Sequence, residues 1–332
     1  MALLQVICIG EALIDRIINK SDSKSQNYLG GAPANVACAL PKLGIPSVFI
    51  GCLGEDAYGQ EFIRLFQKLK VNINFLQMHQ KCSTRVVKVI RDKYGDRSFS
   101  GFENKSNNLF ADEMLDKTEL QKNILSLKNL FSNTKYIITG TNILTSENSC
   151  ECLYFILELA KNFDIKIVVD VNWRDIFWDT SENTKNIKRI DQLKSIKNLL
   201  QYAHILKLSS EEAYLLFETN DPLIIHQMLS KRPDVIITNG SKPILWCING
   251  KQGINKVVNS EEIIDTTGAG DAFLAGLISR LCTVSNSNVN MKEFVDFAST
   301  CGLLTCLGEG AIEPQPGDKQ VYEYLDKLGS VI

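Results

Sequence analysis

Neither sign of charge dominates this chain, which has 36 Lys and Arg against 38 Asp and Glu and a net charge of −2. Such a balance gives no bulk attraction to nucleic acid or to an anionic membrane. No apolar run approaches the ~18 residues that a membrane-spanning helix needs, and no basic region precedes the apolar residues at Met1–Leu4. We therefore expect a cytoplasmic protein that acts on a small molecule, without a nucleic-acid or membrane partner.

The sequence also lacks the spacing of metal and redox centres. Its ten cysteines lie mostly within apolar stretches and form no Cys-x-x-Cys pair, and its three histidines, at positions 79, 204 and 226, are far apart. Zinc sites need clustered thiol and imidazole ligands. The cysteines are therefore predicted to be reduced core thiols, and a zinc site is not expected.

Two familiar phosphate-binding patterns are missing as well. The chain contains no Gly-x-x-x-x-Gly-Lys-[Ser/Thr] loop, and no three-glycine dinucleotide fingerprint follows its first predicted strand. Any phosphate site must therefore be of another kind.

Hydrophobic residues make up 45% of the 332 residues, enough for a sizeable core. Apolar runs with strand length alternate with helical spacing, which is typical of an α/β protein. Predicted strands include 3–9, 47–53, 135–139, 166–171, 205–208 and 235–238. A C-terminal hairpin is predicted from 244–248 and 256–258 around Asn249-Gly250. No boundary divides the main body, so residues 1–332 are predicted to form one domain, from which segments 12–29 and 84–102 project as a small sheet.

The most informative stretch is Asp265-Thr266-Thr267-Gly268-Ala269-Gly270-Asp271. Its glycines permit a tight backbone turn, and the apolar spacing that follows predicts a helix beginning there. The free amides of a helix start favour phosphate oxygens. Asp271 has two readings at this stage: a cap for those amides, or a base that takes a proton from an attacking hydroxyl.

Other polar residues carry open alternatives too. Asp15 is either a solvated edge carboxylate or a hydroxyl-binding group, and Asn35 either bonds its own backbone or faces a ligand. Asp170, at a strand end, is followed in alternation by Asn172 and Arg174, and Arg174 is either a surface cation or a fork for phosphate or carboxylate. Ser209 and Glu212 have the spacing of a capping box, which explains them without any function.

Taken together, the loop 265–271 and the N-terminal Gly30-Gly31-Ala32-Pro33-Ala34-Asn35 resemble the paired signatures of the ribokinase-like PfkB carbohydrate kinase family. The resemblance spans about the whole chain in order. It implies a central, mostly parallel sheet with helices on both faces and a small β-sheet lid over a sugar site. It also implies that ATP with Mg²⁺ donates its γ-phosphoryl group to a sugar hydroxymethyl.

The resemblance assigns roles residue by residue. Asp271 matches the catalytic base, and the anion hole corresponds to Gly268, Ala269 and Gly270. The expected sugar-binding residues are Asp15, Gly30, Gly31, Asn35, Asn104, Lys105, Asn172 and Arg174. The expected nucleotide-binding residues are Lys207, Thr238, Gly240, Gly268, Gly270, Ala298 and Gly302. Glu212 matches a residue that holds Mg²⁺ through water, and Ser209 stands where the family has Asn. Pro243 stands where a glycine is usual in the family. Asp265 and Thr267 mark a possible K⁺ site.

The segment Asp170-Val171-Asn172-Trp173-Arg174-Asp175-Ile176-Phe177-Trp178 is similar to a stretch of fructokinases and 2-keto-3-deoxygluconate kinases. Fructose is therefore the leading predicted substrate, ketodeoxygluconate is the alternative, and a catalytically silent scaffold or a binding protein without transfer are the other hypotheses. We also expect a homodimer through the lid, because Ile14, Val87 and Val89 are predicted to lie on exposed lid faces.

Overall fold

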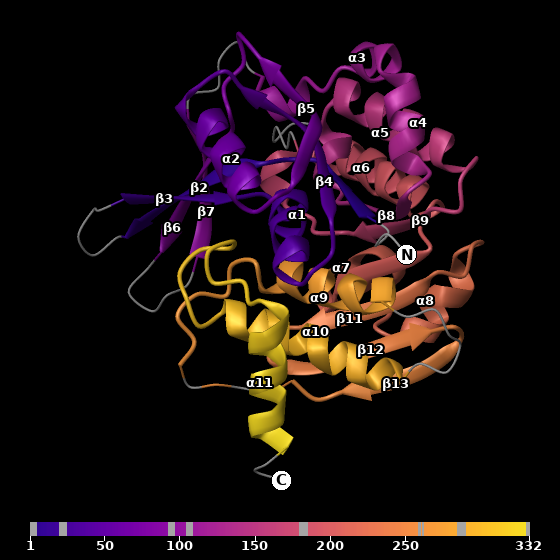
Figure 1. Ribbon diagram of the computed structural model, residues 1–332. Helices are drawn as coiled ribbons and strands as arrows, with labels where there is room; N and C mark the ends of the chain where they lie inside the picture. The colour runs from indigo at the N-terminus through magenta and orange to yellow at the C-terminus, as the bar shows by residue number, and fades with distance from the viewer. Residues whose placement is uncertain are drawn as a thin grey trace.

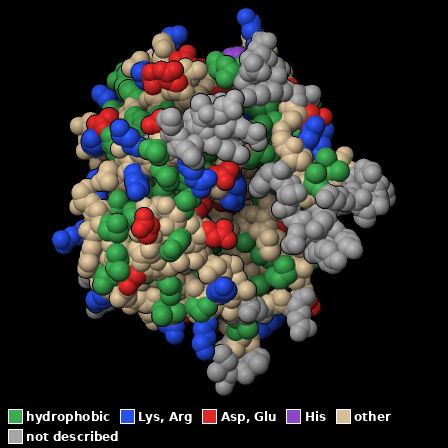
Figure 2. All heavy atoms as spheres, turned by 180° about the vertical axis from the view of Figure 1, so that it is seen from behind, with side chains coloured by type: hydrophobic (Ala, Val, Ile, Leu, Met, Phe, Trp, Pro, Cys, Tyr) green, Lys and Arg blue, Asp and Glu red, His purple; other side chains and the backbone are tan. Residues whose placement is uncertain are grey.

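The computed structural model describes residues 5–19, 25–91, 97–103, 109–178, 185–257, 260, 262–283 and 290–329. Figure 1 shows a large sheet with helices on both sides and a smaller sheet that projects from one edge. On the face shown in Figure 2, basic and acidic side chains are interspersed. None of the described helices is both long and apolar enough to span a membrane.

The large sheet has nine strands within the described residues, in the order β13-β12-β11-β10-β9-β8-β1-β4-β5. All neighbours from β11 to β5 pair in parallel, whereas β11, β12 and β13 form an antiparallel meander. The strands are β1 Gln5–Ile9, β4 Ser47–Gly54, β5 Asn72–His79, β8 Thr134–Thr139, β9 Lys166–Asp170, β10 Ile205–Ser209, β11 Asp234–Asn239, β12 Lys242–Ile248 and β13 Lys251–Asn255. The predicted central, mostly parallel sheet is confirmed.

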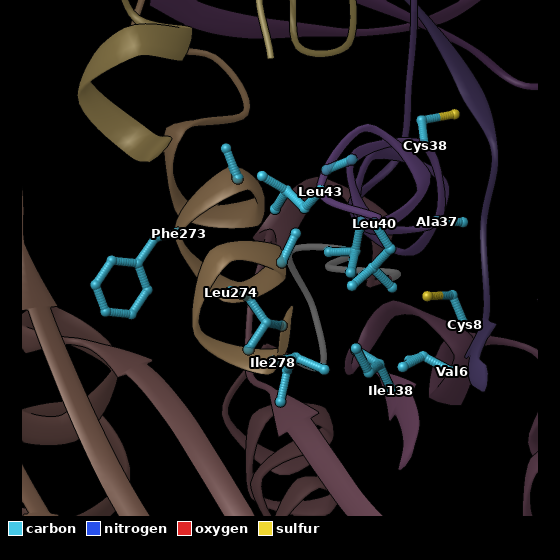
Figure 3. Close-up of a cluster of buried hydrophobic side chains, with 14 of the residues drawn as sticks. Val6, Cys8, Ala37, Cys38, Leu40, Leu43, Ile138, Phe273, Leu274 and Ile278 are labelled. Carbon is cyan, nitrogen blue, oxygen red and sulfur yellow. The ribbon is translucent and has the colours of Figure 1, made fainter. Parts of the chain in front are cut away.

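Alternation along the strands builds a core on each face of this sheet. In β1, Val6 and Cys8 belong to one hydrophobic cluster, while Ile7 and Ile9 belong to the other. Figure 3 shows Val6 and Cys8 beside side chains of α1 and α9. The α-helices are α1 Ala32–Lys42, α2 Ala57–Lys68, α3 Lys117–Lys122, α4 Ile124–Phe131, α5 Glu147–Ala160, α6 Lys185–Leu200, α7 Ser210–Phe217, α8 Pro222–Met228, α9 Ala269–Thr283, α10 Met291–Thr305 and α11 Asp318–Gly329. Short 3₁₀ helices are η2 Ala111–Glu113, η3 Asn142–Thr145 and η4 Asp175–Phe177.

The small sheet has the order β3-β2-β6-β7, with strands β2 Leu13–Asn19, β3 Ser25–Gly30, β6 Val86–Arg91 and β7 Arg97–Glu103. Its two middle strands, β2 and β6, pair in parallel, and each outer strand is antiparallel to its neighbour. The two predicted lid segments therefore do come together in one sheet. The turn expected at Tyr94-Gly95-Asp96 lies outside the described residues.

Two expectations about the strands are wrong. Ile14, Val87 and Val89 are only 1%, 1% and 3% exposed in a single chain, not on open faces. Ile14 packs in the main core, and the two valines lie in a cluster with residues of the same chain. The homodimer thus stays a prediction without this argument.

The second error concerns the C-terminal hairpin, whose last strand is 251–255 rather than 256–258. Asn249 and Gly250 both have positive φ, at 51° and 72°. Such a two-residue turn lets pairing resume at once, and Ile248 pairs with Lys251.

Candidate active site

The carboxyl ends of the parallel strands meet along one cavity of about 440 Å³. In a sheet of this type, ligands bind outside those ends because successive loops converge there. Five neighbouring strands, β1, β8, β9, β10 and β11, each contribute polar side chains from their last residues or from the loop that follows. These are Glu11, Asn142, Asp170, Asn172, Lys207, Ser209 and Thr238.

The glycine loop lies on the same cavity and opens α9, as predicted. Gly268 has φ +76°, and an added Cβ would lie 2.7 Å from Cβ of Ala311. At Gly270, an added Cβ would lie 3.3 Å from Nζ of Lys207. A side chain at Gly268 would therefore clash with Ala311, and one at Gly270 would press on the ammonium of Lys207, so both positions favour glycine.

Asp271, on the first turn of α9, bonds a side chain from another element. Nδ2 of Asn35, on α1, donates to Oδ2 of Asp271 at 2.8 Å. Burial and then the negative charge of Asp170 raise the pKa of Asp271 to about 6, against the opposing hydrogen bond from Asn35 and the charges of Lys207 and Arg174. A carboxylate with that pKa is deprotonated near neutrality but can accept a proton readily, which suits a general base.

Lys207 and Asp170 form a buried ion pair beneath this carboxylate. Nζ of Lys207 donates to the two oxygens of Asp170 at 3.0 and 2.9 Å, and both side chains are 7% exposed. Burial is the largest single influence and lowers the pKa of Lys207, but the charge and hydrogen bonding of Asp170 together with the charges of Asp271 and Glu212 outweigh it, so the pKa is raised. Lys207 is therefore a fixed cation beside Gly270, in the cavity that holds Asp271.

The capping box of α7 is confirmed. Oγ of Ser209 accepts from the amide of Glu212 at 3.1 Å, and Oε2 of Glu212 accepts from the amide of Ser209 at 2.7 Å. Oε1 of Glu212 also accepts from the amide of Trp173 at 2.7 Å, so Glu212 holds the strand-end loop 171–174 against α7. Ser209 thus keeps the capping function although the family motif has Asn there.

A second cavity of about 470 Å³ lies on the other side of the glycine loop. The two cavities share Thr238, Thr266 and Gly270. Of the residues predicted to bind nucleotide, Thr238, Gly240, Gly270 and Gly302 line the second cavity. The structure places Ala298 elsewhere: it is fully buried, and its Cα would lie 3.0 Å from an added Cβ on Gly276 of α9.

The predicted sugar-binding residues fall into three groups. The first cavity is lined by Asp15, Gly31, Asn35, Asn172 and Arg174. Gly30 is not among the lining residues but lies against Asp15, since an added Cβ on Gly30 would be 2.8 Å from Oδ2 of Asp15. Asn104 and Lys105 lie outside the described residues.

Asp265, predicted beside a cation, connects two loops. Its carboxylate accepts from the amide and hydroxyl of Thr267 at 2.8 and 2.7 Å and from the amide of Gly310 at 3.1 Å. Since Asp265 is only 3% exposed, these bonds fix the backbone of the glycine loop.

Sequence reasoning missed several groups near the first cavity. Glu11 and Asn142 line it, and neither was predicted. Arg85 and Asp112 form a pair with 3% and 7% exposed side chains, joined by a 2.9 Å bond. Glu11 followed the first predicted strand directly, so its place at a strand end was the available signal; the Arg85–Asp112 pair had none, because it joins distant segments.

Comparison with known proteins agrees with this architecture. A model of the pfkB family carbohydrate kinases matches residues 3–318. The chain is 29% identical over 330 residues to probable fructokinase-5 of Arabidopsis thaliana, covering 95% of this chain and 96% of that protein.

Two solved structures share the fold. Fructokinase with bound ATP from Xylella fastidiosa has a TM-score of 0.84 at 24% identity, covering 98% of this chain and 99% of the other. Fructokinase from Vibrio cholerae O395 in a form with fructose, ADP and calcium has a TM-score of 0.81 at 24% identity, covering 98% and 100%.

Proposed function

Because the chain belongs to the pfkB family of carbohydrate kinases, we propose that it transfers the γ-phosphoryl group of ATP to the hydroxymethyl of a hexose-like sugar, with fructose as the substrate and fructose 6-phosphate as the product. One observation carries this proposal. Asp271 lies on the first cavity at the start of α9, directly after Gly270, which lines both cavities. A sugar in one cavity and a nucleotide in the other would meet at this carboxylate.

In this mechanism, Asp271 accepts the proton of the sugar hydroxyl while the hydroxyl oxygen attacks the γ-phosphorus. The bond from that phosphorus to the β–γ bridging oxygen breaks, and ADP leaves with its electron pair. The amides at the start of α9 and the ammonium of Lys207, which lies beside Gly270, would stabilise the negative charge that develops on the transferring group. Asn35 orients the base through its hydrogen bond to Oδ2.

The residues fit a metal that arrives with the nucleotide. Among the described residues, no group of three or more His, Cys, Asp or Glu could hold a metal ion by itself. Mg²⁺ commonly keeps several waters and binds through substrate phosphates and one or two carboxylates. Glu212, on the first cavity, would hold it through water, and Mg²⁺ would neutralise phosphate charge. We also propose a K⁺ site beside Asp265 and Thr267. The hydrogen bonds from Thr267 to the Asp265 carboxylate hold the adjoining backbone in place.

Neutral hydroxyls suit the first cavity better than a carboxylate does. Asp15 and Asn35 line it, and Oδ1 of Asn35 is buried without a hydrogen-bond partner among the described residues. Arg174 is the observation that favours ketodeoxygluconate as a second candidate, because a guanidinium can hold a substrate carboxylate. The fructokinase relative supports fructose as the first choice.

A coupled ADP-release assay with MgATP over fructose, ketodeoxygluconate, ribose and adenosine tests the proposal. We expect the highest kcat/KM with fructose. A preference for another sugar would overturn the fructose assignment but not the kinase. Sugar binding by calorimetry without ADP release from any sugar would instead favour the silent scaffold or binding protein. The homodimer and the cytoplasmic location remain part of the proposal, and light scattering at micromolar concentration with sugar present tests the former.

A further inference from the structure

Two buried polar side chains that were not predicted from the sequence lie together on the wall of the first cavity. Glu11 follows β1 and Asn142 follows β8, and these strands are neighbours in the large sheet. Nδ2 of Asn142 donates to Oε1 of Glu11 at 3.1 Å. Their residues are 5% and 7% exposed, and both line the cavity. They therefore form a fixed pair on the wall of the first cavity; the same two residues also line a separate pocket of about 10 Å³, which has room for one water.

Each residue of this pair has one buried oxygen atom without a hydrogen bond to any described residue. Oε2 of Glu11 and Oδ1 of Asn142 have no hydrogen-bond partner within the part of the chain that the structure describes. A buried polar atom without a partner destabilises a protein by about 1–3 kcal/mol. Such atoms persist where a ligand or an ordered water completes them.

The charges around Glu11 leave the pair free for a ligand. Arg85, a cation whose charge acts on Glu11, is bonded to Asp112 and paired with Glu113 at 3.4 Å. Its guanidinium also lies over the rings of Phe102, Phe110 and Phe177 at 5.1, 4.5 and 4.9 Å from their centroids. Arg85 is therefore already neutralised and held in place.

The protonation of Glu11 suits a hydroxyl. Burial raises the pKa of Glu11 to about 7, against a hydrogen bond from its own backbone amide and another from Asn142; the charge of Asp112 adds to the rise, and the charge of Arg85 opposes it. Near neutrality, Oε2 can thus accept a hydrogen bond or donate one, and a sugar hydroxyl can do either. A substrate carboxylate has only acceptor atoms and would face the acidic Glu11 and the oxygen of Asn142.

We propose that Glu11 and Asn142 form a specificity-determining subsite that binds one hydroxyl of the sugar, remote from the hydroxymethyl that reacts. The inference rests on the proposed function. Asp170, which lies close to Asp271, ends β9, and β8 and β1 are the next two strands in the sheet. Two strand spacings separate β9 from β1 by roughly 10 Å. The pair thus comes from strands other than the one that ends in Asp170, so it lines a different part of the cavity wall.

The subsite is tested by crossing protein variants with sugar variants. Glu11→Ala and Asn142→Ala are each assayed for ADP release with fructose and with monodeoxy fructoses that retain the reacting hydroxymethyl. For the wild type, we expect kcat/KM to fall about 10- to 100-fold for the one analogue that lacks the contacted hydroxyl. In each variant, kcat/KM with fructose falls by a similar factor through KM, and that same analogue becomes nearly as good a substrate as fructose.

Gln77→Ala is the matched control. Gln77 is also buried, at 5% exposure, but it bonds the backbone of Asp116 and does not line the cavity. This variant should keep the wild-type ranking of the analogues, so a general loss of stability cannot imitate the expected result.

The outcomes separate the two proposals. If the wild type turns over no sugar, the proposed function fails; if it prefers another sugar, the same cross is made with monodeoxy forms of that sugar. Should both variants keep the wild-type ranking of the analogues, the subsite is overturned and an ordered water completes the pair. If Glu11→Ala does not fold, Asn142→Ala alone decides by the same comparison.

Discussion

The two cavities that share Gly270 differ in the chemical character of the residues that line them. The first is lined by charged side chains held in fixed partnerships, such as Lys207 with Asp170 and Asn35 with Asp271. The second is lined largely by apolar and small residues, among them Phe273, Gly240 and Gly302. Phosphoryl transfer and the selection of one hydroxyl over another require charges and hydrogen-bond donors in fixed positions. The flat base of the proposed nucleotide mainly requires space. Substitutions should therefore act through charge in the first cavity and through volume in the second.

The largest effect is expected at the base. Asp271→Asn keeps the shape of the side chain and an acceptor for Asn35 but removes the proton acceptor, so kcat should fall by about 10²- to 10⁴-fold. Steady-state ADP release measures this, with ATP binding by calorimetry as the control for an intact second cavity. Near-normal turnover in the folded variant would remove Asp271 from the role of base.

A stability loss should follow from breaking the buried pair. Lys207→Met leaves the carboxylate of Asp170 buried without its cation, which should lower the free energy of unfolding by about 3 kcal/mol. Urea denaturation measures the loss. The double variant Lys207→Met/Asp170→Asn removes both charges and should recover most of the stability; equal losses in the two variants would contradict the pair's role.

Activity should depend on pH through Asp271. Since its pKa is raised to about 6 and the base must be deprotonated, kcat/KM should fall below pH 6 and be about tenfold lower at pH 5 than at pH 8. For stability the sign is opposite: the contribution of protonated Asp271 is lost as the pH rises through about 6.

Measuring kcat/KM against pH for two variants shows which carboxyl group causes the fall in activity at low pH, the acid limb of the profile. Asp170→Asn removes a charge that raises the pKa of Asp271, so the acid limb should move to lower pH. Glu11→Gln should leave it in place. A limb that moves with Glu11 and not with Asp170 would assign the titration to Glu11.

The smallest effect is expected from volume in the second cavity. At Gly302, an added Cβ would lie 3.0 Å from the carbonyl oxygen of Ala269, so the backbone must shift slightly. Gly302→Ala should raise KM for ATP about fivefold, equivalent to ~1 kcal/mol, and leave KM for the sugar unchanged. An equal rise in both KM values would show that the two cavities do not respond separately.

Local patterns predicted the parts of this molecule that depend on neighbouring residues. The glycine loop, the start of α9 and the Ser209–Glu212 capping box are set within a few residues, and each is found as expected. Strand β3 (Ser25–Gly30) is largely exposed at a sheet edge and gave no apolar signal, so it was not predicted as a separate strand within the segment 12–29.

Contacts between distant segments could not be predicted. Asn35 lies far from Asp271 in the chain, and each had a sufficient local explanation, so neither pointed to their hydrogen bond. The lid valines Val87 and Val89 were expected to be exposed, because burial by residues of the same chain depends on how the small sheet packs. Contacts between residues that are far apart in the chain are thus the part of the structure that one sequence alone does not predict.

The parallel pairing inside the small sheet constrains the order in which the chain can fold. Ile14 of β2 pairs with Val86 of β6, which the chain reaches only after β4, α2 and β5. Closing such a long loop is entropically unfavourable until the intervening strands have assembled. The small sheet is therefore expected to form late, after the centre of the large sheet. Pulse-labelling hydrogen exchange should show amide protection in β1 and β4 before β2 and β6, and the reverse order would contradict this sequence of events.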